Sequence, residues 1–280
     1  MTNLRATHTD ALRRLLRQSA GITLDAGKEY LVRARLEPVA EQAGLGSVGA
    51  LIEHVDAGTS PLLVDTVVEA MTINETSFFR DAHVFNALRD TILPGLIARP
   101  GRIRIWSAAA STGQEAYSLA MLIREHFADQ AGRFDILATD IATSALARAE
   151  AARYTQLEVN RGLPAPLLLK YFRRTGLDWQ LTDDVRAMVR FRRHNLVGRR
   201  PLGESFDLVL LRNVLIYFDE SARHEVLDRV RGVLRVGGWL VLGATETTSG
   251  IRDGFVRVPE ARALRYEPDT PTHLSTLASR

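Results

Sequence analysis

The amino-acid sequence predicts an α/β fold with a mainly parallel sheet, preceded by a small bundle of helices. Three features lead to this prediction. Apolar residues recur at helical spacing through residues 1–70. From residue 102 onward, strand-like and helical segments alternate, as in sheets built with right-handed crossovers. The first such unit, residues 102–121, reads as a strand, a loop of small residues and a helix, which is how many nucleotide-binding sheets begin.

The composition is that of an ordinary globular protein. The chain has 280 residues, of which 46% are hydrophobic and 25% are charged. It contains no cysteine, which excludes disulfides, thiolate metal sites and cysteine nucleophiles. No apolar run reaches the roughly 20 residues of a membrane span, and the N-terminus lacks the apolar core of a signal peptide. We therefore expect a cytoplasmic location.

Positive charge is concentrated in two segments, although the net charge is only +3. Residues 1–35 carry seven basic side chains against three acidic ones, and residues 161–200 carry ten against three. A position on the solvated surface is enough to explain any single arginine in these segments. Two such segments nevertheless suggest an acidic partner, either a nucleic acid or an acidic protein surface.

The N-terminal region is predicted to be a bundle of four helices with no catalytic group. Thr9 or Asp10 is expected to cap the first helix, which ends at Gly21. The region contains no nucleophile–base pair and no metal-ligand spacing. The later helices are expected from about residue 25 to near 44, over 48–56 and over 61–70.

Residues 71–81 interrupt the helical pattern. A polar cluster at 74–77 is followed by Phe78 and Phe79, which supply an apolar anchor. A linker that caps the next helix with Thr76 or Ser77 explains this pattern without any ligand, and periodicity alone does not exclude that explanation. The next helix is expected to end at Pro94.

The α/β part is predicted from alternating patterns and turn residues. Between residues 154 and 206 the interval is too long for a simple crossover, so we expect an inserted β subdomain with one helix and short strands at 179–181 and 189–192. A turn is expected at Gly237–Gly238. The other expected strands are 103–106, 134–139, 206–211 and 239–243, with a closing antiparallel pair at 256–258 and 263–266; helices are expected at 114–127, 143–152 and 221–234.

The loop at residues 107–113 indicates what kind of ligand the sheet can hold. Gly113 is its only glycine, so the G-x-G-x-x-G pattern of dinucleotide folds is absent, as is the lysine of a P-loop. Both absences argue against a phosphate cradle. A ligand with an adenosine but no pyrophosphate, such as S-adenosylmethionine, fits better.

Polar side chains follow two of the predicted strands. Asp140 either accepts hydrogen bonds from ribose hydroxyls or caps the following helix. Asn213 and Tyr217 follow the strand at 206–211, where they either face a ligand or cap and pack the apolar segment RNVLIYF. The seven histidines are scattered without metal-binding spacing, and no G-x-S-x-G elbow is present, so we expect no metal and no serine nucleophile.

Five motifs resemble those of the CheR family, the chemotaxis receptor glutamate O-methyltransferases. They are MTINETSFFRD, WSAAASTGQEAYSLAM, ILATDIATSALARAEAARY, FDLVLLRNVLIYF and LRVGGWLVLGATET, in the family's order and spacing. The resemblance covers essentially the whole chain. It implies a helical domain at 1–70, a linker and connecting helix at 71–94, and a Rossmann-like S-adenosylmethionine-binding domain at 95–280 with a β subdomain at about 157–195.

The resemblance also implies site residues, carried over motif by motif. Arg80 and Tyr217 are the expected catalytic residues, with Arg80 orienting the incoming carboxylate and Tyr217 shaping the methyl pocket. Family members often have STGEEPYS where this chain has Gln114, Glu115 and Ala116, so either Gln114 or Glu115 is the expected contact. The implied cofactor contacts are Asn74, Thr76, Arg80, Ala108, Glu115, Asp140, Asn195, Leu196, Asn213 and Val214.

The same resemblance suggests partners and products. Arg13, Arg17, Arg33 and Arg35 are expected to bind the acidic helical methylation region of a chemoreceptor, and the basic β subdomain resembles a site that holds a receptor's C-terminal tail in some members. The expected products are glutamate 5-O-methyl esters and S-adenosylhomocysteine, and a monomer is expected. Two alternatives stay open: a methyltransferase of this fold acting on nucleic acid or a small molecule, and a non-catalytic cofactor-binding scaffold.

Overall fold

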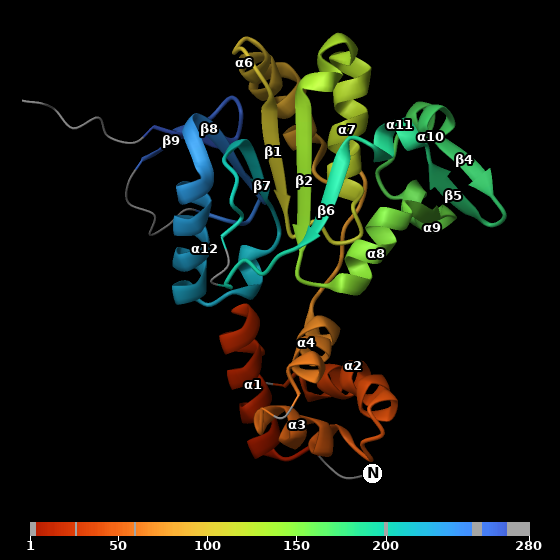
Figure 1. The fold of residues 1–280 in the computed structure, drawn as a ribbon, viewed down its shortest axis with the longest axis vertical. Coiled ribbons are helices and arrows are strands. Elements are labelled where there is room, and N and C mark those ends of the chain that lie inside the picture. The colour runs from red at the N-terminus through yellow and green to blue at the C-terminus, as the bar shows by residue number, and fades with distance from the viewer. Residues whose placement is uncertain (1–3, 26, 59, 199–200, 248–253, 268–280) are drawn as a thin grey trace, which may run out of the picture.

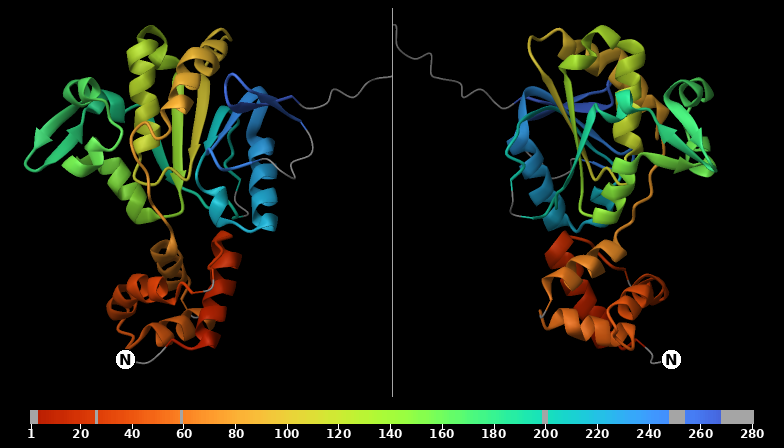
Figure 2. Two further views of the ribbon diagram at one scale, coloured as in Figure 1. Left: turned by 180° about the vertical axis from the view of Figure 1, so that it is seen from behind. Right: turned by 45° about the vertical axis from the view of Figure 1, so that its right-hand side comes forward.

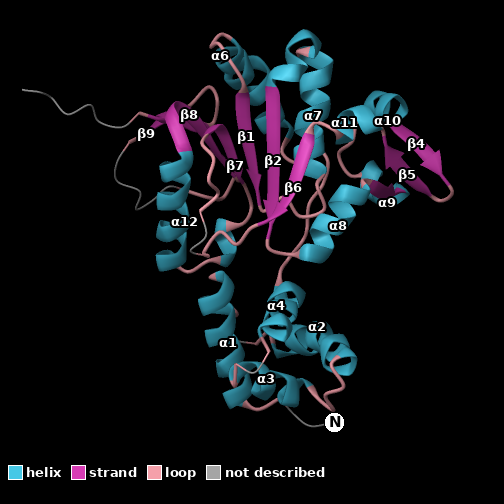
Figure 3. Cartoon of the chain, in the orientation of Figure 1, coloured by secondary structure: helices cyan, strands magenta, loops and turns pink. Residues whose placement is uncertain are grey.

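The structure is a computed structural model that describes residues 4–25, 27–58, 60–198, 201–247 and 254–267. Figure 1 shows a cluster of helices at the N-terminal end and, next to it, a sheet with helices packed around it. In Figure 3, a second, small sheet stands beside the main one. The predicted α/β fold class and the N-terminal helical bundle are confirmed.

The N-terminal helices share one apolar core. Leu12, Leu36 and Leu51, from three different helices, are completely buried in it. The first helix ends at Gly21 (φ 68°), as predicted, because glycine adopts the left-handed cap conformation without strain. The second begins later than predicted, after Gly27. The bundle consists of α1 (Ala6–Ala20), α2 (Glu29–Gln42), α3 (Val48–Asp56) and α4 (Pro61–Met71).

The start of α1 differs from the prediction. Neither Thr9 nor Asp10 caps the helix, which begins upstream, with Arg5 in the cap position and no side-chain cap bond. His8 and Thr9 are both buried in the bundle. Packing of these two side chains therefore favours a longer helix over a cap at either predicted residue.

The linker after α4 ends in a buried aromatic anchor. Phe78 is completely buried, and its ring meets that of Tyr154 edge-on, with 5.0 Å between centroids. Neither Thr76 nor Ser77 caps the next helix, because both remain in the extended linker and Asp81 (φ 63°) takes that position. The linker is thus fixed by its apolar residues, and its polar residues are available for other contacts.

The connecting helix continues past its predicted end. It consists of α5 (Ala82–Ala87), a π-helical turn (Leu88–Ile92) and α6 (Leu93–Ile97). Pro94 does not end the helix, because it lies in the first turn of α6. The backbone N–H that proline lacks contributes little to the hydrogen bonds of a helix at that position.

The main sheet has seven strands in the order β6-β2-β1-β7-β8-β10-β9. The pairs among β6, β2, β1, β7 and β8 are parallel, and β10 joins β8 and β9 in antiparallel pairs. Because the strand order reverses at β1, a crevice opens beside its carboxyl end. The strands are β1 (Ile103–Ala108), β2 (Phe134–Asp140), β6 (Val189–Arg193), β7 (Phe206–Leu211), β8 (Leu234–Leu242), β9 (Phe255–Val258) and β10 (Ala263–Tyr266).

The predicted β subdomain exists but is built differently. The strand expected at 189–192 is β6, which pairs with β2 as an edge of the main sheet, so its assignment to the subdomain is wrong. Its place is filled by β3 (Arg153–Thr155), which lies before the predicted boundary and pairs with β5 (Asp178–Leu181). β4 (Phe172–Thr175) completes the small sheet. The segment between β3 and β6 contains three helices rather than the one expected: α9 (Gln156–Asn160), α10 (Ala165–Tyr171) and α11 (Asp183–Arg186).

The turn predicted at Gly237–Gly238 is also wrong. Both glycines lie inside β8, which runs from Leu234 to Leu242. Gly237 has a φ of 71°, and the pairing register between β7 and β8 shifts nearby, between Phe206 and Leu208. The two glycines therefore mark an irregularity within one strand rather than its start.

Helices cover both faces of the main sheet. Ile105 of β1 packs in one core with residues of α5 and α7, whereas its neighbour Trp106 packs in a second core with α12. This alternation follows from the two-residue period of a strand. The helices of this domain are α7 (Gln114–His126), α8 (Thr143–Ala151) and α12 (Glu220–Val233), with short 3-10 turns at Ala128–Arg133 and Leu215–Tyr217.

Candidate functional site

A cavity of about 240 Å³ lies between the main sheet and the helical bundle. In Figure 1, the arrowheads of β1, β2 and β6 point toward the N-terminal helices. The carboxyl ends of parallel strands beside a reversal of strand order are where open α/β sheets bind ligands. The cavity is lined by the α1–α2 connection, the linker after α4, the loop after β1 and the segment after β7.

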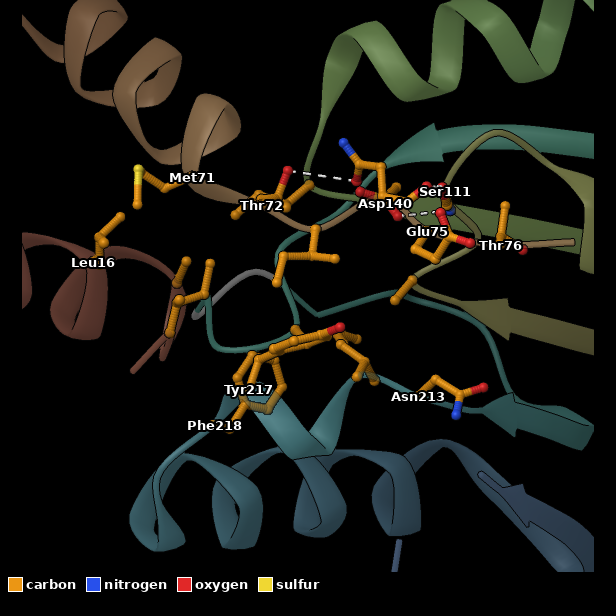
Figure 4. Close-up of a pocket in the computed structure, with 18 of the residues that line it drawn as sticks. Leu16, Met71, Thr72, Glu75, Thr76, Ser111, Asp140, Asn213, Tyr217 and Phe218 are labelled. Carbon is orange, nitrogen blue, oxygen red and sulfur yellow. Dashed lines mark hydrogen bonds between the residues drawn. The ribbon is translucent and has the colours of Figure 1, made fainter. Parts of the chain in front are cut away.

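The loop after β1 brings its backbone to the cavity. Ala109 (φ 57°) and Ser111 (φ 52°) both adopt left-handed conformations, which are strained for residues other than glycine. The Ser111 N–H donates to Oδ2 of Asp140, and its hydroxyl donates to the Asn74 carbonyl, each at 2.8 Å. These bonds hold the loop against both β2 and the linker. Figure 4 shows Ser111 beside Asp140 at the cavity.

Asp140 is a buried carboxylate at the end of β2. It is 6% exposed and lines the cavity. Burial raises the pKa of its carboxyl group, and hydrogen bonds from the backbone N–H groups of Ala142, Ser111 and Ile141 oppose that rise. The bond from the Ala142 N–H does not cap α8, because Ala142 is itself the N-cap residue and that helix has no side-chain cap bond; contact of Asp140 with the ribose stays a prediction. The Asp140 carboxylate has further lone pairs that are not used by these N–H groups, and they could accept hydrogen bonds from ribose hydroxyls.

A buried arginine joins the linker to α7. Arg212 has a side chain only 2% exposed; its Nη1 lies 2.7 Å from Glu115 Oε2, and its Nη2 lies 2.8 Å from Asp81 Oδ2. Nη2 also donates to the Arg80 carbonyl at 2.8 Å, and Ser107 donates to Glu115 Oε1. The sequence analysis missed Arg212, although a charged residue directly after the apolar strand 206–211 was an available signal.

The structure separates the two adjacent candidates at the start of α7. Glu115 lines the cavity. Gln114 is 2% exposed, and its Oε1 accepts a hydrogen bond from the Thr112 hydroxyl at 2.8 Å. Glu115 is therefore the one placed to meet a ligand, and its contact with the cofactor stays a prediction.

The predicted linker residues lie along one wall of the cavity. Asn74, Thr76 and Arg80 all line it. The Arg80 guanidinium makes one hydrogen bond within the described residues, from Nη1 to the Glu75 carbonyl at 3.3 Å. Its other donors are therefore available to a ligand.

The segment after β7 forms the facing wall. Asn213, Val214 and Tyr217 line the cavity, and Figure 4 shows Asn213 and Tyr217 across from Asp140. The Tyr217 carbonyl accepts two hydrogen bonds from Thr23 of the helical bundle, from its N–H at 2.9 Å and from its hydroxyl at 3.0 Å. The bundle thus supports this wall directly.

Three further predicted cofactor contacts have different surroundings. Asn195 and Leu196 line the cavity. The Asn195 amide is partly engaged already, donating to the Ser19 carbonyl at 2.6 Å and accepting from the Val197 N–H at 3.0 Å. Ala108 is buried at the end of β1 and does not line the cavity.

The four arginines predicted to bind a substrate protein are not gathered in one place. Only Arg35 lines the cavity, and it donates to two carbonyl oxygens at the end of α4 and the start of the linker. Arg17 pairs with Asp219 of the α/β domain, and Arg13 bonds within the bundle. Arg33 borders a separate hollow in the bundle.

The part of the chain that the structure describes lacks two features. No group of three or more histidine, cysteine, aspartate or glutamate residues is arranged to hold a metal ion. None of the helices combines the length and apolar character needed to cross a membrane.

The fold and the cavity define a class of protein. A mostly parallel sheet, a loop without a phosphate cradle, a buried aspartate after β2 and a glutamate at the start of α7 suit S-adenosylmethionine. Residues 74–263 match the family model described as CheR methyltransferase, SAM binding domain, and residues 8–72 match that described as CheR methyltransferase, all-alpha domain. The chain belongs to the CheR methyltransferase family, and its cofactor is S-adenosylmethionine, which confirms both expectations.

Curated relatives match over nearly the whole chain. Chemotaxis protein methyltransferase 1 of Pseudomonas aeruginosa is 40% identical over 264 residues, covering 92% of this chain and 96% of the relative. Chemotaxis protein methyltransferase Cher2 of Pseudomonas putida is 37% identical, with the same two coverages. Chemotaxis protein methyltransferase of Vibrio parahaemolyticus is 40% identical over 88% of this chain and 90% of the relative.

Solved structures that match are more distant. The DhpI complex with S-adenosylhomocysteine is 14% identical, with a TM-score of 0.37 over 85% of this chain and 80% of that one. The glycopeptide N-methyltransferase MtfA in complex with S-adenosylhomocysteine is 16% identical, with a TM-score of 0.36 over 66% of this chain and 58% of that one.

Proposed function

We propose that this protein methylates glutamate side chains of chemoreceptors, using S-adenosylmethionine as the methyl donor. The products are glutamate 5-O-methyl esters and S-adenosylhomocysteine, and the reaction serves adaptation in chemotaxis. Relatives named chemotaxis protein methyltransferases, up to 40% identical over most of the chain, support this assignment.

The observation that carries the proposal is the position of Arg80. Arg80 lines the same cavity as Tyr217, and its guanidinium has donors that no described residue occupies. A guanidinium can hold a carboxylate through two parallel hydrogen bonds. Arg80 therefore suits a substrate whose reacting group is a carboxylate.

Methyl transfer to a carboxylate requires the protein mainly to position the two reactants and to exclude water. The bound cofactor supplies a methyl group activated by a sulfonium. A glutamate is ionised at neutral pH, since its ordinary pKa is about 4.3, so no general base is required. Arg80 orients the carboxylate, Tyr217 shapes the space for the methyl group, and the two cavity walls exclude water from charges that neutralise as the reaction proceeds.

The assignments of individual contacts belong to the same proposal. Asp140 and Glu115 hold the ribose and the methionine end of the cofactor, and Asn195 and Leu196 flank the adenine. Asn74, Thr76, Asn213 and Val214 complete the cofactor site, and Ala108, which does not line the cavity, is left out of it.

The partner in this proposal is the acidic helical methylation region of a receptor. Arg13, Arg17, Arg33 and Arg35 all lie on the helical bundle, where Arg13 and Arg17 pair with Asp10 and Asp219 and would exchange those carboxylates for acidic side chains of the receptor. The small β subdomain is proposed to hold a receptor tail, and the protein to act as a cytoplasmic monomer.

One experiment separates this function from its alternatives. The protein is incubated with S-adenosylmethionine labelled in the methyl group, together with chemoreceptor-containing membranes, and with RNA in a parallel reaction. Label on the receptor that is released by base as methanol supports a glutamate methyl ester. Label on RNA, or cofactor binding without any transfer, would overturn the proposal.

A further inference from the structure

The carboxylate of Glu246 accepts four hydrogen bonds from backbone N–H groups. Glu246 follows β8 in the segment GATET and does not line the cavity. Its Oε1 accepts from Val214 at 2.8 Å and from Leu215 at 2.7 Å. Its Oε2 accepts from Asn213 at 2.8 Å and from Gly243 at 2.7 Å. Three of the four donors belong to the wall of the cavity that follows β7.

These N–H groups need a partner from outside their own segment. β7 ends at Leu211, and the short helical turn begins at Leu215, so neither a sheet ladder nor a helix accepts from the residues between. Asn213 also adopts a left-handed conformation (φ 58°), which directs consecutive N–H groups toward one side. An N–H group buried without an acceptor costs about 1–3 kcal/mol. The Glu246 carboxylate removes that cost for three residues at once.

The position of Gly243 shows that this contact is closely fitted. A Cβ atom at Gly243 would lie 2.6 Å from Glu246 Oε2 and 2.9 Å from the Asn213 nitrogen. Any larger residue would therefore separate the carboxylate from the turn. Within the described residues Glu246 forms no ion pair, and the four backbone N–H groups that it accepts from favour its negative charge.

We propose that Glu246 is a positioning residue that sets the cofactor-facing turn carrying Asn213, Val214 and Tyr217. The assignment of that turn to the cofactor rests on the proposed function. Without the carboxylate, the turn loses the acceptor that its three N–H groups share, and the cavity wall relaxes away from the geometry that binds the cofactor. The effect should appear first in cofactor affinity and then in turnover.

The test compares Glu246→Gln and Glu246→Ala with Glu260→Ala, which removes an exposed glutamate elsewhere in the C-terminal part of the chain. Affinity for S-adenosylhomocysteine is measured by calorimetry, and folding by circular dichroism and thermal midpoint. We expect at least a tenfold loss of affinity for Glu246→Ala, at least a threefold loss for Glu246→Gln, which keeps the size but only one acceptor oxygen, and no change for Glu260→Ala.

Chemical rescue distinguishes positioning from a general loss of structure. Added formate or acetate should restore most of the affinity of Glu246→Ala, whereas chloride at equal ionic strength should not. Affinity of folded Glu246→Gln within twofold of the wild type, or absence of any carboxylate rescue, would overturn the proposal. The binding measurement uses no receptor, so its outcome stands even where methyl transfer to chemoreceptors fails.

Discussion

At the scale of single residues, the cavity depends on charges that are buried but paired. Arg212 is held by Glu115 and Asp81, and Asp140 accepts N–H groups from Ser111 and Ala142. Arg80 differs from them, because among the described residues its guanidinium makes one hydrogen bond, to a carbonyl. Groups with satisfied partners hold the site in shape, whereas Arg80 keeps donors that suit the substrate carboxylate of the proposed function.

Replacing Arg80 should therefore affect turnover strongly. Arg80→Ala removes a charge-assisted hydrogen bond worth about 1.5–3 kcal/mol, so kcat/KM for methyl transfer to a receptor should fall roughly 10- to 100-fold. Arg80→Lys keeps the charge but cannot hold a carboxylate with two parallel bonds, so it should recover only part of the loss. A value within twofold of the wild type for Arg80→Ala would show that Arg80 does not orient the substrate.

The burial of Asp140 predicts a pH dependence of stability. Its pKa is raised in the folded protein, so ionisation costs stability as the pH rises from the ordinary aspartate value, about 3.9, through the raised value. Asp140→Asn does not ionise. The stability of the wild type relative to this variant should therefore fall as the pH rises from 4 to 7.

Chemical denaturation of the two proteins at several pH values measures this trend, and a relative stability that rises with pH would contradict it. In the same variant, affinity for S-adenosylmethionine at pH 7 should fall at least tenfold, because the carboxylate no longer serves the ribose.

The sequence predicted residues that belong to recognisable motifs, and missed those whose role comes from contacts across the fold. Asp140, Asn213 and Tyr217 follow strands and were expected at the cavity, where they lie. Arg212 and Glu246 act through partners far away in the chain. Neither spacing nor periodicity carries that information, since both describe only local geometry.

At the scale of secondary-structure elements, local patterns predicted which segments are strands better than which sheet they join. The strand pattern near residue 189 was read correctly, but β6 pairs with β2 rather than with the small sheet. The apolar pattern of a strand fits either sheet, and non-local packing selects between them. At Gly237–Gly238 the local pattern failed in a different way. Two consecutive glycines are a common turn signal, but here they lie within the paired strand β8.

The small β subdomain should depend on one glycine that meets the linker. Gly162 (φ 85°) follows α9, and a Cβ atom there would lie 2.0 Å from the Phe78 carbonyl oxygen. Gly176 (φ 62°), in the same subdomain, has nothing within 4 Å of such an atom. Both Gly→Ala variants incur backbone strain, but only the first also forces the linker to move.

Gly162→Ala should therefore lose about 1–3 kcal/mol more of the free energy of unfolding than Gly176→Ala. Urea denaturation of the two variants measures the difference. Equal losses would mean that the contact between Gly162 and Phe78 does not constrain the linker.

At the scale of the whole molecule, the helical bundle and the α/β domain are joined on both sides of the cavity. Figure 2 shows the bundle against one end of the larger domain from two further directions. On one side, Thr23 supports Tyr217. On the other, Glu69 of α4 accepts the N–H groups of Thr143 and Ser144, which begin α8, at 2.9 and 2.7 Å. The bundle therefore helps to build the cavity as well as to border it.

The contact between Glu69 and α8 should weaken at low pH. Burial raises the pKa of Glu69, but hydrogen bonds from Ser144 and Thr143 outweigh burial, and the net pKa is lowered. A lowered pKa means that the ionised carboxylate stabilises the folded state above the ordinary glutamate value, about 4.3, and that this contribution is lost as the pH falls. Because Glu69 is only partly buried, solvent screens its interactions, and we expect about 0.5–1 kcal/mol.

Hydrogen exchange at the first amides of α8 measures this contribution locally. Glu69→Gln should speed exchange there about two- to fivefold at pH 7, and the ratio to the wild type should approach one as the pH falls through the lowered pKa of Glu69 and the wild-type carboxyl becomes protonated. Asp10→Asn is the control: Asp10 pairs with Arg13 of its own helix in an exposed ion pair, which should contribute little. A ratio that does not depend on pH, or an equal effect of Asp10→Asn, would show that the Glu69 carboxylate does not hold the two domains together.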